Sequence, residues 1–278
     1  MALFIKENAI KFVNCENLEN LRVLLLSGNQ LTSIHGLESA VNLDVLELSH
    51  NRISRIGGLK SFKRLQKLLI DHNQLISTRG LGEVYTLLHL DCSNNHLTSL
   101  EDIDSCALLS TLKLHGNNLT ETPCLNSHVL MKELYLDDNC ITSLDALSVS
   151  WLPMLRRISV SQNSLTELPS LSDCVSLQSL DISHNCLSEQ RSDTVYCTMI
   201  SLACSYLQSA LLEMVPGLWK IDGESIGPPP ARGTDGGGDP WPSSFLAFCQ
   251  AQFVQVERTN RKHMSELWLV SPAAKPQG

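Results

Sequence analysis

Ser225 is the residue with the clearest catalytic pattern around it. Residues 223–227 read GESIG, which matches G-x-S-x-G, the pattern of a nucleophilic serine on a sharp turn between a strand and a helix. Three prolines follow at residues 228–230, and proline disrupts the helix that such a turn requires. We therefore expect Ser225 to have no catalytic role and the protein not to be an enzyme.

Histidines and carboxylates that could bind a metal ion lack a complete ligand set in the sequence. His50, His72 and His184 each stand directly before a recurrent asparagine, and the first two are 22 residues apart. If the segments stack as strands do, at about 5 Å, His50 and His72 become neighbours. The sequence supplies no third ligand beside them, so we expect turn histidines rather than a metal site. Glu133 and residues 137–138 are expected to form a solvated acidic surface, and no cofactor is predicted.

The charge, the N-terminus and the cysteines exclude several classes of protein. The net charge is −8, whereas nucleic-acid binding needs concentrated positive charge. No apolar run approaches the ~18 residues of a membrane span, and the N-terminal MALFI is broken at once by Lys6 and Glu7. The 10 cysteines never fall as C-x-x-C, so we expect reduced, core-filling thiols. These features predict a cytoplasmic protein with no nucleic-acid or membrane partner.

A repeat must position these side chains. The first clear copy of the repeat contains Leu21, Leu24, Leu26 and Asn29, and the same spacing of leucine and asparagine recurs along the chain. The asparagine recurs every 22 residues, except for one interval of 24 whose extra residues, near 148–153, we expect to bulge on the convex side. The recurrent asparagines are Asn29, Asn51, Asn73, Asn95, Asn117, Asn139, Asn163 and Asn185.

Each position of the repeat has a physical role. The alternation of apolar and polar residues points Leu68 and Ile70 inward. It points Lys67, Leu69 and Asp71 outward. One repeat cannot bury its leucines alone, but stacked repeats can. The asparagine follows the strand, where its amide can bind backbone groups that the turn leaves unpaired. We therefore predict a structural ladder of asparagines.

This pattern resembles the leucine-rich repeat family in its 22-residue intracellular class. The resemblance implies an α/β leucine-rich repeat solenoid, or horseshoe, with a parallel β-sheet on its concave face and short 3-10 or irregular convex segments. We assign residues 1–187 to about eight repeats plus a partial first one, whose strand begins near or before Met1. Residues 188–226 are expected to form a helical C-terminal cap that covers the last apolar layer. Residues 227–243 read as a flexible Pro/Gly linker, and 244–278 as an amphipathic helix and disordered tail.

A narrower resemblance comes from residues 87–147, the insertion SVSWLP and the later FLAFCQAQ. These segments are similar to leucine-rich repeat and IQ domain-containing proteins. The resemblance implies calmodulin as a partner, bound through IQ motifs that follow the repeats. The nearest approach here is VQVER at residues 254–258, where the arginine arrives one position early and no glycine follows. We interpret the chain as a shortened form that lacks IQ motifs, so calmodulin binding is not carried over to it.

The outward strand positions form the surface that we expect to bind a partner. A solenoid presents such a surface already shaped, so docking costs little conformational entropy. The selected residues are Val23, Leu25, Val45, Lys67, Leu69, His89, Asp91, Lys113, Tyr135 and Arg157. The sequence thus predicts a non-catalytic protein–protein interaction scaffold with a protein partner on its concave face. The alternative is a calmodulin-linked or cytoskeletal or ciliary adaptor that acts through the C-terminal helix.

Overall fold

The computed structural model describes residues 1–168, 171, 173–187, 215 and 217–226. All of them belong to one compact unit, residues 1–230. Most of the expected helical cap, the whole linker and the whole C-terminal helix and tail lie outside the described residues. Within the part that is described, no helix is both long enough and apolar enough to cross a lipid bilayer.

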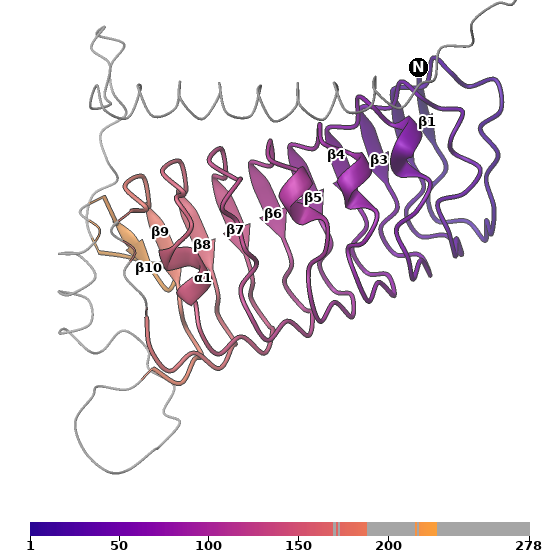
Figure 1. Ribbon diagram of the computed structural model, residues 1–278. Helices are drawn as coiled ribbons and strands as arrows, with labels where there is room; N and C mark the ends of the chain where they lie inside the picture. Colours follow the sequence, from indigo (N-terminus) through magenta and orange to yellow (C-terminus); the bar gives the residue numbers. More distant parts are fainter. Residues whose placement is uncertain (169–170, 172, 188–214, 216, 227–278) are drawn as a thin grey trace, which may run out of the picture. The chain divides into compact units, whose positions relative to one another are not determined.

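Short strands, one for each repeat, stack in sequence order in a single sheet (Figure 1). Neighbouring repeat strands are parallel, and residues one repeat apart pair directly, so Leu46 lies between Leu24 and Leu68. The strands are β1 Ala2–Phe4, β2 Val23–Leu25, β3 Val45–Glu47, β4 Lys67–Leu69, β5 His89–Asp91, β6 Thr111–Lys113, β7 Glu133–Tyr135, β8 Arg157–Ser159 and β9 Ser179–Asp181. This arrangement confirms the parallel β-solenoid predicted from the repeat. The strand expected near or before Met1 begins at Ala2.

The segments that return from one strand to the next are short. They include the 3-10 helices η1 Leu59–Ser61, η2 Leu81–Glu83 and η3 Ile103–Ser105, and the α-helix α1 Asp145–Ser148. Helix α1 lies in the repeat with two extra residues, where the hydroxyl of Ser150 donates to the carbonyl oxygen of Ala146 at 2.7 Å. The insertion leaves the sheet register intact, because Leu134 in β7 still pairs with Ile158 in β8.

The core is one continuous stack of aliphatic side chains. The central residue of each strand from β2 to β9 is fully buried; these residues are Leu24, Leu46, Leu68, Leu90, Leu112, Leu134, Ile158 and Leu180. Cys15, Cys92, Cys106 and Cys174 are buried in the core, whereas Cys124 and Cys140 are exposed and so depart from the expectation of core-filling thiols. Burial raises the pKa of the Cys106 thiol to about 12 and that of Cys174 to about 11. Both therefore remain protonated near neutral pH.

The asparagines bind consecutive repeats to one another. The Asn95 side-chain amide donates to the carbonyl oxygens of Ile70, Cys92 and Ser93 at 3.0–3.1 Å. Its Oδ1 accepts from the backbone N–H of Leu75 at 2.9 Å. Seven of the eight asparagines are buried. Asn139 makes the same set of bonds while partly exposed.

The described end of the array, residues 217–226, differs from the helix expected there, whereas most of the expected helical cap lies outside the described residues. Residues 217–226 contain a hairpin of two strands, β10 Lys220–Ile221 and β11 Glu224–Ser225, which pair antiparallel. Strand β10 also pairs parallel with β9. A sheet edge leaves backbone N–H and C=O groups unpaired, and a further strand pairs them where a helix would not. The turn uses left-handed backbone at Asp222 (φ 47°) and Gly223 (φ 84°), and the buried Ile221 covers the last core layer.

His128 is a fully buried histidine whose protonation opposes folding. Its Nε2 lies 3.1 Å from the carbonyl oxygen of Ile103. Burial lowers the pKa of His128 below its ordinary value of 6.5. The unfolded chain therefore takes up a proton at a higher pH than the folded chain does. Consequently, this group should lower the free energy of unfolding as the pH falls below 6.5.

Replacing His128 with glutamine should remove part of this acid sensitivity. The glutamine amide does not titrate, and it can still donate to the carbonyl oxygen of Ile103. Burial also lowers the pKa of His89, so that residue contributes in the same direction and is kept in both proteins. Thermal denaturation midpoints measured between about pH 8 and pH 5 check this expectation. Equal loss of stability with acid in the wild type and His128→Gln would contradict it.

Candidate interaction surface

The first and third residues of each repeat strand share one face of the sheet, which we call the open sheet face. Side chains alternate along a strand, so the central residue enters the core while its two neighbours point away from it. Strand pairing aligns these positions in two rows across the sheet. All of the residues selected from the sequence as partner-binding lie in these two rows. Nine of these ten side chains are partly exposed, and that of Arg157 is exposed.

Charged and aromatic side chains in the middle of the open sheet face form a connected group. We call Asp91, Lys113, Glu133, Tyr135 and Arg157 the central network. The ammonium group of Lys113 lies 3.5 Å from Asp91 Oδ2 and 5.9 Å from the centre of the Tyr135 ring. Arg157 donates to the Tyr135 hydroxyl at 3.1 Å, and that hydroxyl donates to Glu133 Oε2 at 3.2 Å. The network spans β5 to β8 and holds the Tyr135 ring in a defined position.

The electrostatics of this region favour a fixed set of charges. The hydrogen bond to the Tyr135 hydroxyl raises the pKa of Arg157, so the guanidinium stays charged. His89 lies beside Lys67 in the first row. Burial, followed by the charges of Lys67 and Lys113, lowers the pKa of His89, which keeps its ring neutral near pH 7. The positive charge available to a partner is therefore that of Lys67, Lys113 and Arg157.

Toward the first strands, the open sheet face becomes more apolar. Val23, Leu25, Val45 and Leu69 were expected to be exposed, but each is only partly exposed. Neighbouring strands lie about 5 Å apart, so each side chain covers part of the next. The largest exposed apolar side chain of this region is Phe4, which is 66% exposed and pairs in register with Leu25. Sequence reasoning missed Phe4, although its 21-residue spacing from Leu25 was a usable signal.

The carboxylates considered as a cation site are engaged by the protein's own donors. Asp137 Oδ1 accepts from the Ser161 hydroxyl at 2.8 Å and also from the Ser159 hydroxyl. Glu133 accepts from Tyr135, as described above. Ser225 lies within strand β11 and is exposed.

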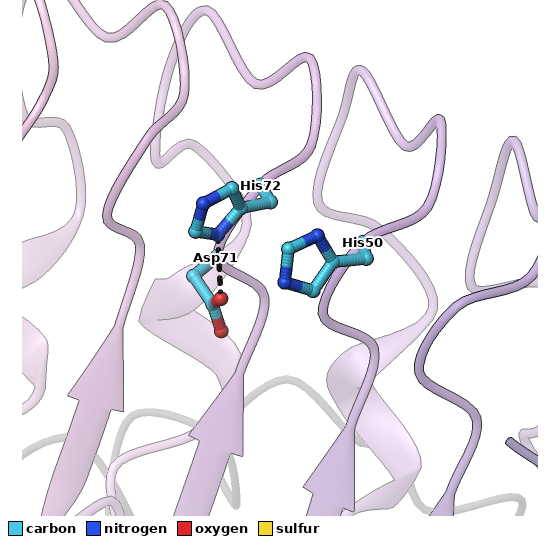
Figure 2. A group of neighbouring side chains, drawn as sticks. All are labelled: His50, Asp71 and His72. Carbon is cyan, nitrogen blue, oxygen red and sulfur yellow. Dashed lines mark hydrogen bonds and ion pairs between the residues drawn. The ribbon is translucent and has the colours of Figure 1, made fainter. Parts of the chain in front are cut away.

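The structure brings together three potential metal ligands that the sequence analysis did not predict to lie together. His50 and His72 are neighbours, as their spacing predicted, and Asp71 lies beside both (Figure 2). The expectation that no third ligand lies nearby is therefore wrong. Asp71 precedes His72 directly in the sequence, but only the fold shows that its side chain lies close to both turn histidines.

Comparison with known proteins shows similarity over part of the chain. Residues 130–187 match the leucine rich repeat family. Over 33 residues, 12% of the chain, the sequence is 61% identical to leucine-rich repeat- and IQ domain-containing protein 1 of Mus musculus. The matched stretch spans only 2% of that protein. The first match identifies leucine-rich repeats in residues 130–187. The second covers only a small part of the mouse protein.

Solved structures of low sequence identity share the fold. An internalin from Listeria monocytogenes matches with a TM-score of 0.67 and 20% identity over 79% of this chain and 59% of its own. A leucine-rich repeat protein from Leptospira interrogans matches with a TM-score of 0.67 and 25% identity, over 79% of this chain and 54% of its own. The structure of a TLR13–ssRNA13 complex matches with a TM-score of 0.59 and 21% identity, over 69% of this chain and 30% of its own. The chain thus spans less than two thirds of each neighbour and has the leucine-rich repeat architecture.

Proposed function

We propose that this chain is a non-catalytic, cytoplasmic scaffold that binds a protein partner on its open sheet face. Proteins of the leucine-rich repeat fold commonly mediate protein–protein interactions, and extended repeat surfaces serve this role in solenoids generally. The central network is the observation that carries the proposal. It combines a tyrosine, an arginine and a lysine, and tyrosine and arginine are enriched among the residues that dominate binding energies.

The contacts within the central network support binding rather than a purely structural role. Tyr135 and Arg157 belong to the open sheet face and not to the aliphatic core. Their mutual hydrogen bond at 3.1 Å restricts both side chains before any partner arrives, which reduces the entropy lost on docking. We infer a partner that offers carboxylates to Arg157 and Lys113 and an apolar side chain to the region of Phe4 and Leu69.

A nucleic-acid partner is the competing interpretation, since one structural neighbour is a complex with single-stranded RNA. RNA binding draws most of its affinity from positive charge against phosphates. This chain has a net charge of −8, and the carboxylates of Asp91 and Glu133 lie within the central network itself. The charge distribution therefore favours a protein.

Replacing Tyr135 with alanine should weaken partner binding by about 2 kcal/mol, roughly a 30-fold rise in Kd. The substitution removes the ring beneath Lys113 and the hydroxyl that holds Arg157. A partner is first identified by crosslinking and affinity capture from cytosol. Its Kd is then measured with purified proteins, for the wild type, Tyr135→Ala and Leu69→Asp.

Tyr85→Ala is the matched control for this experiment. Tyr85 is 52% exposed and lies between η2 and β5, outside the two rows of the open sheet face. Its loss should leave the Kd unchanged. A deletion of residues 240–278 tests the adaptor alternative, in which the C-terminal segment binds. A partner that tolerates Tyr135→Ala and Leu69→Asp but is lost with the deletion would overturn the assignment to the sheet face.

A further inference from the structure

Two histidines meet on adjacent turns at one edge of the open sheet face. His50 follows β3 and His72 follows β4, and both have left-handed backbone, with φ of 54° and 52°. The fold holds these turns through backbone hydrogen bonds: His50 N–H donates to the Asp71 carbonyl and His72 N–H to the Ser93 carbonyl, each at 2.9 Å. The two side chains therefore start from fixed points one repeat apart.

The side chains at these points converge with a carboxylate (Figure 2). The imidazole rings stack with their centres 4.0 Å apart and their planes inclined by 21°. His72 Nδ1 lies 2.9 Å from Asp71 Oδ2. One ligand atom from each of the three residues lies within 4.8 Å of the other two. The hydroxyl of the buried Ser49 donates to the other oxygen of Asp71 and so orients the carboxylate.

The fold does not require histidine at this turn position. Other repeats place different residues there with the same left-handed backbone: Glu7, Gly28, Asn94, Gly116, Asp138 and Gln162. Side chains of adjacent turns come close in this row, since a Cβ on Gly116 would lie 2.6 Å from Asn94 Oδ1. The fold therefore requires only left-handed backbone at this turn position, not a particular side chain. The pairing of two imidazoles beside an oriented carboxylate is specific to His50, Asp71 and His72.

We propose that His50, Asp71 and His72 bind a divalent transition-metal ion, with Zn²⁺ as the representative case. Neutral imidazole nitrogens and a carboxylate oxygen are ligands that zinc prefers, at about 2.0–2.2 Å. Ligand atoms around one tetrahedral ion lie about 3.5 Å apart. The three atoms here lie within 4.8 Å of one another, so small side-chain movements bring them to that spacing when the ion binds. Both histidine side chains are exposed and can make this movement. Three protein ligands leave the fourth position to water.

The serine behind the site adds to this assignment. In many metal sites, one oxygen of a carboxylate ligand binds the metal and the other accepts a hydrogen bond. This hydrogen bond fixes the orientation of the ligand. Ser49 supplies that bond to Asp71. The site is separate from the central network, and the proposed partner binding does not depend on it.

The test is zinc affinity measured on the full chain by competition with a chromophoric chelator. His50→Asn and His72→Asn each remove one ligand, and asparagine suits left-handed backbone, as Asn94 does at the equivalent turn. Each variant should bind Zn²⁺ at least about 10-fold more weakly than the wild type. His184→Asn is the matched control. His184 occupies the same turn position (φ 55°), but the preceding repeat has Gln162 there rather than a second histidine. It should bind Zn²⁺ as the wild type does.

Two further measurements separate the loss of a histidine ligand from misfolding and from zinc binding by thiolates. Circular dichroism without metal must show the same folded signal for all four proteins. Visible spectra of the Co²⁺-substituted wild type report the ligands, since thiolate ligands add intense charge-transfer absorption that nitrogen and oxygen ligands lack; Cys124 and Cys140 are the exposed thiols of the described residues. Zinc affinity equal in the wild type, His50→Asn and His72→Asn, or a thiolate spectrum, would overturn the proposal.

Discussion

Replacing Leu112 with alanine is expected to lower the free energy of unfolding by about 2–5 kcal/mol. Leu112 is the fully buried central residue of β6 and pairs in register with Leu90 and Leu134. The substitution removes buried apolar atoms and leaves a cavity between two neighbouring repeats. Each repeat contacts only its neighbours, so a cavity in the middle of the stack weakens the interfaces on both sides.

Denaturant unfolding followed by far-ultraviolet circular dichroism measures this loss. Leu88→Ala is the control, because Leu88 precedes β5 and is 40% exposed. Its substitution should change the free energy of unfolding by no more than about 0.5 kcal/mol. If the two alanine variants had equal stability, the continuous aliphatic stack would not be what stabilises the array.

Replacing Asn95 with alanine is expected to cost about 1–3 kcal/mol. The side chain is 5% exposed and joins two repeats: it donates to the Ile70 carbonyl of the preceding one and to the Cys92 carbonyl of its own. It also accepts from Leu75 N–H. Alanine leaves these backbone groups buried without their partner, and an unsatisfied buried group carries its full desolvation cost.

Asn118→Ala separates the ladder from a general effect of losing an asparagine. Asn118 follows the ladder residue Asn117 directly, but its side chain is exposed. We expect its removal to change the denaturation midpoint little. A midpoint unchanged by Asn95→Ala, or lowered equally by both substitutions, would contradict the structural role of the ladder.

The fold could be predicted from the sequence because its physics is local and repeated. The spacing of Leu24, Leu26 and Asn29 specifies a strand, its inward face and the turn that follows. Repetition of this unit leaves stacking as the way to bury the leucines. For the same reason, the two extra residues between β7 and β8 could be assigned to the connection between these strands. There they leave the pairing of Leu134 with Ile158 unchanged.

The candidate sites were less predictable, because they depend on side-chain conformation across strands. The rows of the open sheet face followed from the alternation, but the bond from Arg157 to the Tyr135 hydroxyl did not. Likewise, the spacing of His50 and His72 made them neighbours, whereas the approach of Asp71 depends on its orientation by Ser49. The β10–β11 hairpin was not predicted at residues 217–226. It pairs with backbone N–H and C=O groups at the edge of β9, and no local sequence pattern marks such unpaired groups.

Site-specific photocrosslinking tests the proposed interaction surface most directly. A photoreactive phenylalanine analogue is placed at Tyr135 in one protein and at Tyr85 in another, and both proteins are irradiated with the partner. We predict a crosslinked product from position 135 whose yield falls when unlabelled wild-type protein is added, and none from position 85. Crosslinking from position 85 alone, or equally from both positions, would contradict binding at the open sheet face.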